Sequence, residues 1–222
     1  MNSLVPLGDR ALLAYFAVEE DAGRFAARVR RRHPPWLSDV VQAYASVAVF
    51  FDLDRIDPEL AADQLRRLDA EDVSPEETSL GQLHQIPCCY EMGPDLDRVV
   101  RHAGLDREEV IRLHAATEYT VYAIGFCPGF PYLGYLPDPL CGVPRLDEPR
   151  LSVPVGSVGL TGRQTGIYTE KRPGGWNLIG QTPLCLVDVA SGYFPLRTGD
   201  RVRFVRVDEA EFRRMAGRRL AE

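Results

Sequence analysis

Apolar and polar positions follow two different periods along the first half of the chain, which predicts a mixture of helices and strands. Residues 11–16 form a short apolar segment, and apolar side chains then recur at helical spacing over residues 20–32. Two strands follow, residues 40–45 with alternating apolar positions and residues 47–51 as a continuous apolar run. The pattern therefore begins as strand, helix, strand, strand.

A second helix and a last strand complete this part of the pattern. Asp57 and Pro58 are typical of the N-cap and first position of a helix, which continues to about Leu68. Residues 83–90 form a further apolar strand. The order strand-helix-strand-strand-helix-strand is that of ferredoxin-like domains. We therefore predict a small ferredoxin-like βαββαβ domain over residues 1–90.

The remaining chain, residues 91–222, changes to short segments separated by turns. Two short helices are expected between residues 95 and 116, capped by Asp95 and Asp106, and a strand follows at 119–124. Later apolar segments recur roughly every ten residues with turn signals between them. This spacing predicts a closed or nearly closed β-barrel as the second domain of an α+β chain.

The placement of glycine and proline supports this division. The 222 residues include 19 Gly and 17 Pro, and 23 of these 36 lie between Gly125 and Gly199. Because both residues interrupt helices, their density excludes an all-helical second half.

Charge and cysteine content exclude several classes of function. The formal net charge is −6, and no basic stripe with interleaved aromatic residues is present, so nucleic-acid binding is not expected. No apolar run is long enough to span a membrane. The five cysteines lie scattered without a zinc spacing, which favours a cytoplasmic protein with reduced thiols and predicts no metal site.

Residues 125–134, which are GFCPGFPYLG, predict an irregular loop, because glycine and proline make up half of them. Two roles are open for it. The loop forms a rigid pocket wall for a ligand, or it plugs one end of the barrel. The candidate ligand-binding residues here are Phe126, Pro128, Gly129 and Phe130.

Two further pairs of residues are candidates for chemistry. His114 and Glu118 stand four residues apart, which on a helix puts both on one face as a general acid/base pair or as a surface pair. Arg145 and Arg150 carry guanidinium groups that suit a carboxylate or phosphate, or else salt bridges within the chain.

Residues 152–195 contain few charged side chains, namely Arg163, Glu170, Lys171, Arg172 and Asp188. A polar but weakly charged stretch fits either a ligand pocket or a protein interface. Neither standard phosphate-binding loop, GxxxxGK[ST] or GxGxxG, occurs in it. Its candidate ligand-binding residues are Pro154, Gly156, Ser157, Gln164, Thr165, Gly166, Tyr168, Gly174, Gly175 and Trp176.

Several long motifs together resemble the KipI/PxpB family, whose members are also described as the B subunit of 5-oxoprolinase, allophanate hydrolase subunit 1 or carboxyltransferase subdomain C. The resemblance spans nearly the whole chain. It is carried by IPCCYEMGPDL (86–96), LHAATEYTVYAIGFCPGFPYLGYLP (113–137), PRLDEPRLSVPVGSVGLTGRQTGIY (144–168), PGGWNLIGQTP (173–183) and RTGDRVRFV (197–205).

The resemblance implies a cyclophilin-like barrel and a subunit that is not a complete enzyme. It implies two partner subunits, one KipA/PxpC-like and one LamB/YcsF (PxpA)-like. The resulting complex would couple ATP hydrolysis to the opening of 5-oxoproline, which gives glutamate, and no cofactor would be covalently bound. In that setting His114 would transfer protons, Arg145 and Arg150 would hold anionic groups, and Gln164 with Thr165 would hydrogen-bond the ligand. Two alternatives remain: an inhibitor of a sensor histidine kinase, and a component of a urea- or allophanate-type carboxyltransferase or amide hydrolase.

Overall fold

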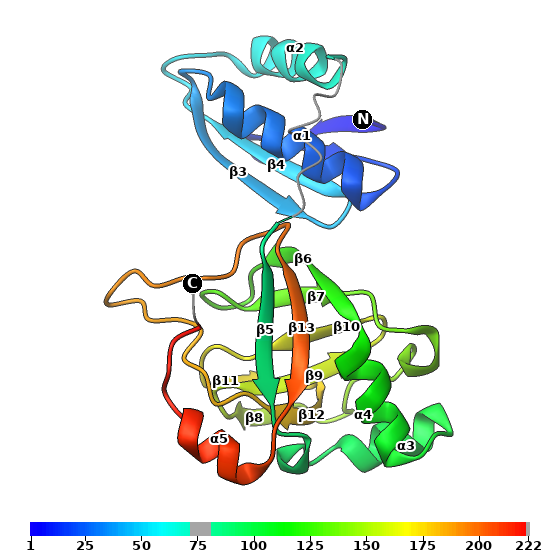
Figure 1. Cartoon of the computed structure of the whole chain (residues 1–222). Coiled ribbons are helices and arrows are strands. Elements are labelled where there is room, and N and C mark those ends of the chain that lie inside the picture. The colour runs from blue at the N-terminus through cyan, green and yellow to red at the C-terminus, as the bar shows by residue number, and fades with distance from the viewer. Residues whose placement is uncertain (72–80, 221–222) are drawn as a thin grey trace. The chain divides into compact units, whose positions relative to one another are not determined.

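The computed structural model describes residues 1–71 and 81–220, and the chain divides into two compact units, Met1–Leu80 and Gly81–Glu222 (Figure 1). The first unit is an antiparallel sheet with the strand order β1-β2-β4-β3 and two helices. Its strands and helices are β1 (Ser3–Pro6), β2 (Ala11–Tyr15), α1 (Glu19–Arg32), β3 (Leu37–Ala43), β4 (Ser46–Phe51) and α2 (Pro58–Asp69).

Local sequence signals explain these elements. The side chain of Asp57 accepts a hydrogen bond from the backbone N–H of Leu60 at 2.9 Å, so the predicted cap of α2 is confirmed. Phe25 and Val29 of α1 are buried in one apolar core with Leu65 of α2 and Val49 of β4. The helical spacing of apolar residues thus produces the buried face of α1.

The predicted ferredoxin-like domain is not confirmed, because its expected last strand lies in the second unit. There, β5 (Leu83–Cys88) pairs in parallel with β13 (Arg201–Arg206). The sheet edge beside β2 is occupied by β1, which pairs with β2 as an antiparallel hairpin. The division between the units accordingly falls after Leu80, not after residue 90. An apolar strand suits either sheet, and only its distant partner decides between them.

The second unit contains a nearly closed β-barrel, in agreement with the prediction. Its seven-stranded sheet has the order β12-β9-β10-β7-β6-β13-β5. Cys89 and Gln181 exchange two backbone hydrogen bonds of 2.8 and 3.0 Å between the two edges and so close the sheet. The remaining barrel strands are β6 (Glu118–Ile124), β7 (Pro131–Gly134), β9 (Ser157–Thr161), β10 (Gln164–Ile167) and β12 (Asn177–Gln181).

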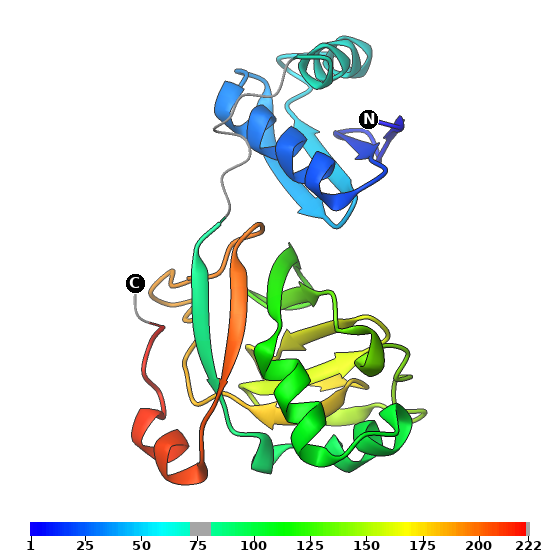
Figure 2. The same ribbon diagram turned by 45° about the vertical axis from the view of Figure 1, so that its right-hand side comes forward.

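Helices and a small second sheet complete this unit. In it, α3 (Leu96–Ala103) contacts β12, and α4 (Arg107–Ala116) contacts β13 (Figure 2). A two-stranded sheet pairs β8 (Arg150–Val153) with β11 (Arg172–Gly174), and α5 (Glu209–Met215) follows β13. Within residues 1–71 and 81–220, no helix has the length and apolar character needed to cross a membrane.

A candidate ligand-binding site

Four aromatic side chains gather around Phe130 beside the barrel. The ring centre of Phe130 lies 5.4 Å from that of Phe126, 4.9 Å from Tyr132, 5.3 Å from Tyr168 and 5.6 Å from Trp176. All four contacts are edge-to-face, the geometry that aromatic rings favour. These rings border a cavity of about 280 Å³, which we call the aromatic pocket. It is lined by Phe126, Phe130, Tyr132, Arg145, Pro149, Tyr168, Pro173, Gly174, Gly175 and Trp176.

Glycines make room for two of these rings. A Cβ atom at Gly166 would lie 2.9 Å from the ring of Phe130, and one at Gly174 would lie 2.3 Å from the hydroxyl of Tyr168. No side chain fits at either position without moving the ring. The glycine-rich motifs of the sequence therefore act by letting aromatic side chains approach the backbone.

The loop of residues 125–134 is only partly irregular. Residues 131–134 form β7, which pairs with β6 and β10, so the prediction of a loop over all ten residues is wrong for its last four. The first part forms the pocket wall, where Phe126 has a φ of +65°. Pro128 and Gly129 belong to this turn and do not line the aromatic pocket.

Among the described residues that line the aromatic pocket, only Arg145 is charged. Its guanidinium forms no hydrogen bond or ion pair with any described residue, so it is available to an anion. Burial raises the pKa of the Tyr132 and Tyr168 hydroxyls, and the positive charge of Arg145 partly offsets this rise. The guanidinium lines the same pocket as both phenols. The pocket can bind a planar ligand that carries one negative group.

His114 lies elsewhere, inside the barrel core. The side chain has no exposed surface, and its ring stacks on Phe204 with centres 4.7 Å apart. Nδ1 lies 2.7 Å from the hydroxyl of Tyr90, and Nε2 lies 3.0 Å from Oγ1 of Thr165. Both ring nitrogens thus have partners within the protein.

These partners determine which nitrogen of the imidazole carries the proton. The Thr165 hydroxyl donates to the carbonyl of Gly159 at 3.0 Å, so it accepts from Nε2–H of His114. Nδ1 then accepts the hydrogen bond from Tyr90. Burial lowers the pKa of His114 to about 3, in agreement with a neutral ring. Tyr90, His114, Thr165 and Gly159 form a chain of hydrogen bonds that we call the buried relay.

His114 and Glu118 do not form the predicted pair. Helix α4 ends at Ala116, and Glu118 is the first residue of β6, so the two side chains do not share a helical face. The carboxylate of Glu118 forms ion pairs with Arg201 and Arg203 of β13 instead. Opposite charges on neighbouring strands stabilise the β6–β13 pair.

Arg150 is also engaged within the chain. Its guanidinium lies 2.6 Å from the carboxylate of Asp95, whose other oxygen accepts from the backbone N–H of Leu178 at 2.7 Å. The prediction that the Asp95 side chain caps α3 is therefore wrong, since it makes no capping hydrogen bond. Of the two predicted anion-binding arginines, the structure leaves Arg145 free and pairs Arg150.

Arg150→Ala is expected to lower the free energy of unfolding of the second unit by about 1–3 kcal/mol, because the half-buried carboxylate of Asp95 loses its charged partner. Urea denaturation of both proteins measures the difference. The matched control is Arg197→Ala, which removes an exposed guanidinium. Equal stability of wild-type protein and Arg150→Ala would contradict the structural role of this pair.

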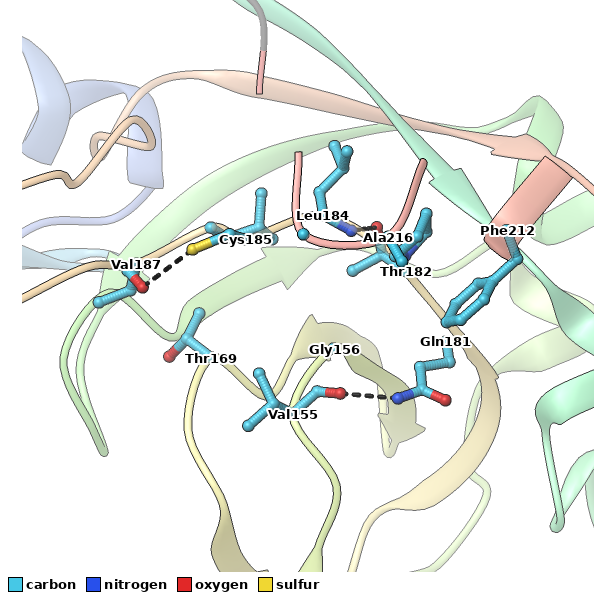
Figure 3. A pocket seen from close by; sticks show the side chains of 13 residues that line it. Val155, Gly156, Thr169, Gln181, Thr182, Leu184, Cys185, Val187, Phe212 and Ala216 are labelled. Atoms are coloured by element: carbon cyan, nitrogen blue, oxygen red, sulfur yellow. Dashed lines mark hydrogen bonds between the residues drawn. The ribbon is translucent and has the colours of Figure 1, made fainter. Parts of the chain in front are cut away.

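A second cavity of about 250 Å³ lies between the β8–β9 turn, the chain after β12 and α5 (Figure 3). Gly156 is the only predicted site residue that lines it. Polar groups of its lining form hydrogen bonds with one another: Gln181 donates to the carbonyl of Val155 at 2.8 Å, and the Cys185 thiol donates to the carbonyl of Val187 at 3.4 Å. This cavity therefore presents mainly apolar surface.

The other predicted residues separate into lining and supporting positions. Phe126, Phe130, Arg145, Tyr168, Gly174, Gly175 and Trp176 line the aromatic pocket. Pro154, Ser157 and Gln164 line neither cavity, and Thr165 belongs to the buried relay. The sequence interpretation did not include Tyr132, although Tyr132 stands within the aromatic-rich loop motif and that motif could have indicated it.

Comparisons with known proteins agree with this architecture. The family model "Carboxyltransferase domain, subdomain C and D" matches residues 2–194. The chain is 36% identical to the B subunit of 5-oxoprolinase from Bacillus subtilis, over 93% of each chain. It is 44% identical to the protein of the same name from Escherichia coli O157:H7, over 76% of this chain and 79% of that one.

A solved structure extends the similarity to the fold. The crystal structure of TTHA0988 matches 90% of this chain with a TM-score of 0.78 at 36% identity. This chain spans only 40% of TTHA0988, so the same fold occurs there within a longer polypeptide.

Proposed function

Because the chain belongs to the carboxyltransferase subdomain C and D family, we propose that it is the B subunit of an ATP-dependent 5-oxoprolinase and that its aromatic pocket holds the cyclic amide. The observation that carries this proposal is the combination of aromatic walls with one unpaired guanidinium, Arg145. The planar lactam ring packs against the rings around Phe130, and the carboxylate of 5-oxoproline pairs with Arg145.

The same lining supports a role as one component of a larger enzyme. Among its described residues the aromatic pocket has no carboxylate, imidazole, thiol or amine. Such a site can bind and orient a ligand, but it lacks a general base and the carboxylates that would hold the magnesium ion of ATP. We therefore assign nucleotide binding and proton transfer to KipA/PxpC-like and LamB/YcsF-like partner subunits. His114, buried and neutral, supports the barrel in this proposal and transfers no proton.

ATP is needed because an amide carbonyl is a poor electrophile. Transfer of the γ-phosphoryl group to the amide oxygen releases ADP and activates the carbon. Addition of water and cleavage of the C–N bond, with protonation of the nitrogen, give an acyl phosphate, and a second water releases phosphate and glutamate. The contribution of this chain is to fix the ring and its carboxylate while the partners act. The free thiols of the described cysteines suit a cytoplasmic location.

Arg145→Ala in the reconstituted complex is expected to raise KM for 5-oxoproline by roughly 10- to 100-fold, since a charge-assisted hydrogen bond contributes about 1.5–3 kcal/mol. The assay measures glutamate released with ATP. Arg163→Ala is the matched control, because its guanidinium stacks on Tyr135 at 4.3 Å and lies outside the pocket lining.

Two results would contradict the proposal. An unchanged KM in Arg145→Ala would show that the carboxylate of 5-oxoproline does not bind in this pocket. If the wild-type complex releases no glutamate but carboxylates urea or cleaves allophanate, the substrate is urea or allophanate and not 5-oxoproline.

A further inference from the structure

Exposed apolar side chains occur on strand β8 of the second unit and on the three loops that follow β6, β8 and β12. Their exposed fractions run from 44% at Phe194 to 92% at Leu151, which is almost fully in solvent. We call this set the rim patch. It consists of Phe126, Leu151, Val155, Val189 and Phe194.

Several contacts place the three loops next to one another. A Cβ atom at Gly129 would lie 2.3 Å from Val187 and 3.5 Å from Phe194, so the turn after Phe126 packs on the loop that carries Val189 and Phe194. Val155 and Val187 line the second cavity together (Figure 3).

The rim patch borders the mouth of the aromatic pocket. Phe126 belongs to both. Leu151 lies in β8, which begins directly after Pro149 and lies opposite the strand that contains Pro173, and both prolines line the pocket. The patch therefore meets the opening of the pocket at Phe126 and at β8.

The composition of these loops is that of an interface. Contiguous exposed apolar surface is uncommon on proteins that act alone, and interface cores are depleted of charge and enriched in aromatic side chains. Residues 152–195 contain few charges, and Phe126 and Phe194 supply aromatic surface. A partner face that fits here is itself apolar and weakly charged at its centre.

We infer that the rim patch is the docking surface of the partner protein that completes the active site, an inference that rests on the proposed function. Two observations select this occupant. The aromatic pocket lacks acid/base groups, so whatever supplies them must reach its mouth. The matching fold in TTHA0988 occupies only 40% of a longer chain, so that fold exists joined to further polypeptide. Docking at the rim brings the partner's reactive groups to the bound amide and excludes water.

Leu151→Asp and Val189→Asp test the docking surface, because both side chains lie in the patch but not in the pocket lining. Each variant is co-expressed with an affinity-tagged KipA/PxpC-like partner, and the Kd of the complex is measured with the purified proteins. We expect at least a tenfold weaker complex for each. Leu60→Asp is the matched control, since Leu60 is 49% exposed on α2 of the other unit and we expect it to bind as wild type does. Thermal unfolding of the free variants verifies that each is folded.

Three outcomes separate the possibilities. Binding of both patch variants at wild-type affinity would overturn the docking surface. A free chain that is dimeric, and that Leu151→Asp makes monomeric without weakening the complex, would show that the occupant is a second copy and would also overturn it. Loss of binding by the patch variants together with a wild-type complex inactive on 5-oxoproline would support the docking surface while refuting the proposed function.

Discussion

His114→Ala is expected to lower the free energy of unfolding of the second unit by about 3–5 kcal/mol. The change removes a buried ring that stacks on Phe204, and it leaves the Tyr90 hydroxyl without its acceptor and the Thr165 hydroxyl without its donor. A cavity in a packed core and unpaired buried polar groups each cost free energy, and here the two effects add.

Urea denaturation followed by the fluorescence of Trp176 measures this loss. A Trp36→Phe background leaves Trp176 as the only tryptophan, so the signal reports the second unit. His102→Ala is the matched control, because His102 is exposed on α3. A loss below 1 kcal/mol in His114→Ala would mean that the buried relay does not stabilise the barrel.

Acid is expected to destabilise the second unit through the same histidine. Burial lowers the pKa of His114 to about 3, whereas an unfolded histidine has a pKa of about 6.5. Between these values the unfolded chain binds the extra proton, so stability is greatest above pH 6.5 and falls as the pH decreases toward 3. From pH 6.5 to 5 the expected loss is about 1.5 kcal/mol.

The pH dependence is measured by urea denaturation between pH 7 and 5, where carboxylates remain largely ionised. His114→Asn should show a flatter profile than the wild type, because it has no imidazole to titrate. Parallel profiles for the two proteins would show that His114 is not the group whose neutral form the fold requires.

Elements with local signals were predictable from the sequence, and pairings between distant segments were not. The cap at Asp57 and the apolar periodicity of α1 each depend on residues only a few positions apart in the chain, so short windows reveal them. The sheet to which β5 belongs depends on β13, near the other end of the chain. Nothing within residues 83–90 distinguishes a last strand of the first unit from a first strand of the second.

The candidate site shows the same limit. The glycine and aromatic motif of residues 125–134 left a pocket wall and a barrel plug equally open, and only the structure places Phe126 and Phe130 in a pocket lining. Arg145 and Arg150 looked equivalent in sequence, yet only Arg150 meets Asp95, which stands 55 positions earlier. His114 was chemically plausible as an acid/base residue, and only the structure shows that its side chain is completely buried in the barrel core.

The parallel pairing of β5 with β13 has a consequence for synthesis of the chain on the ribosome. All strands of the first unit belong to Met1–Leu80, so this unit can fold while translation continues. The barrel cannot close in the same way, since β13 ends at Arg206 and supplies the partner of both β5 and β6. Until nearly the whole chain has emerged, β5 and β6 have open edges, and during this interval the barrel strands are exposed to aggregation or to capture by a chaperone.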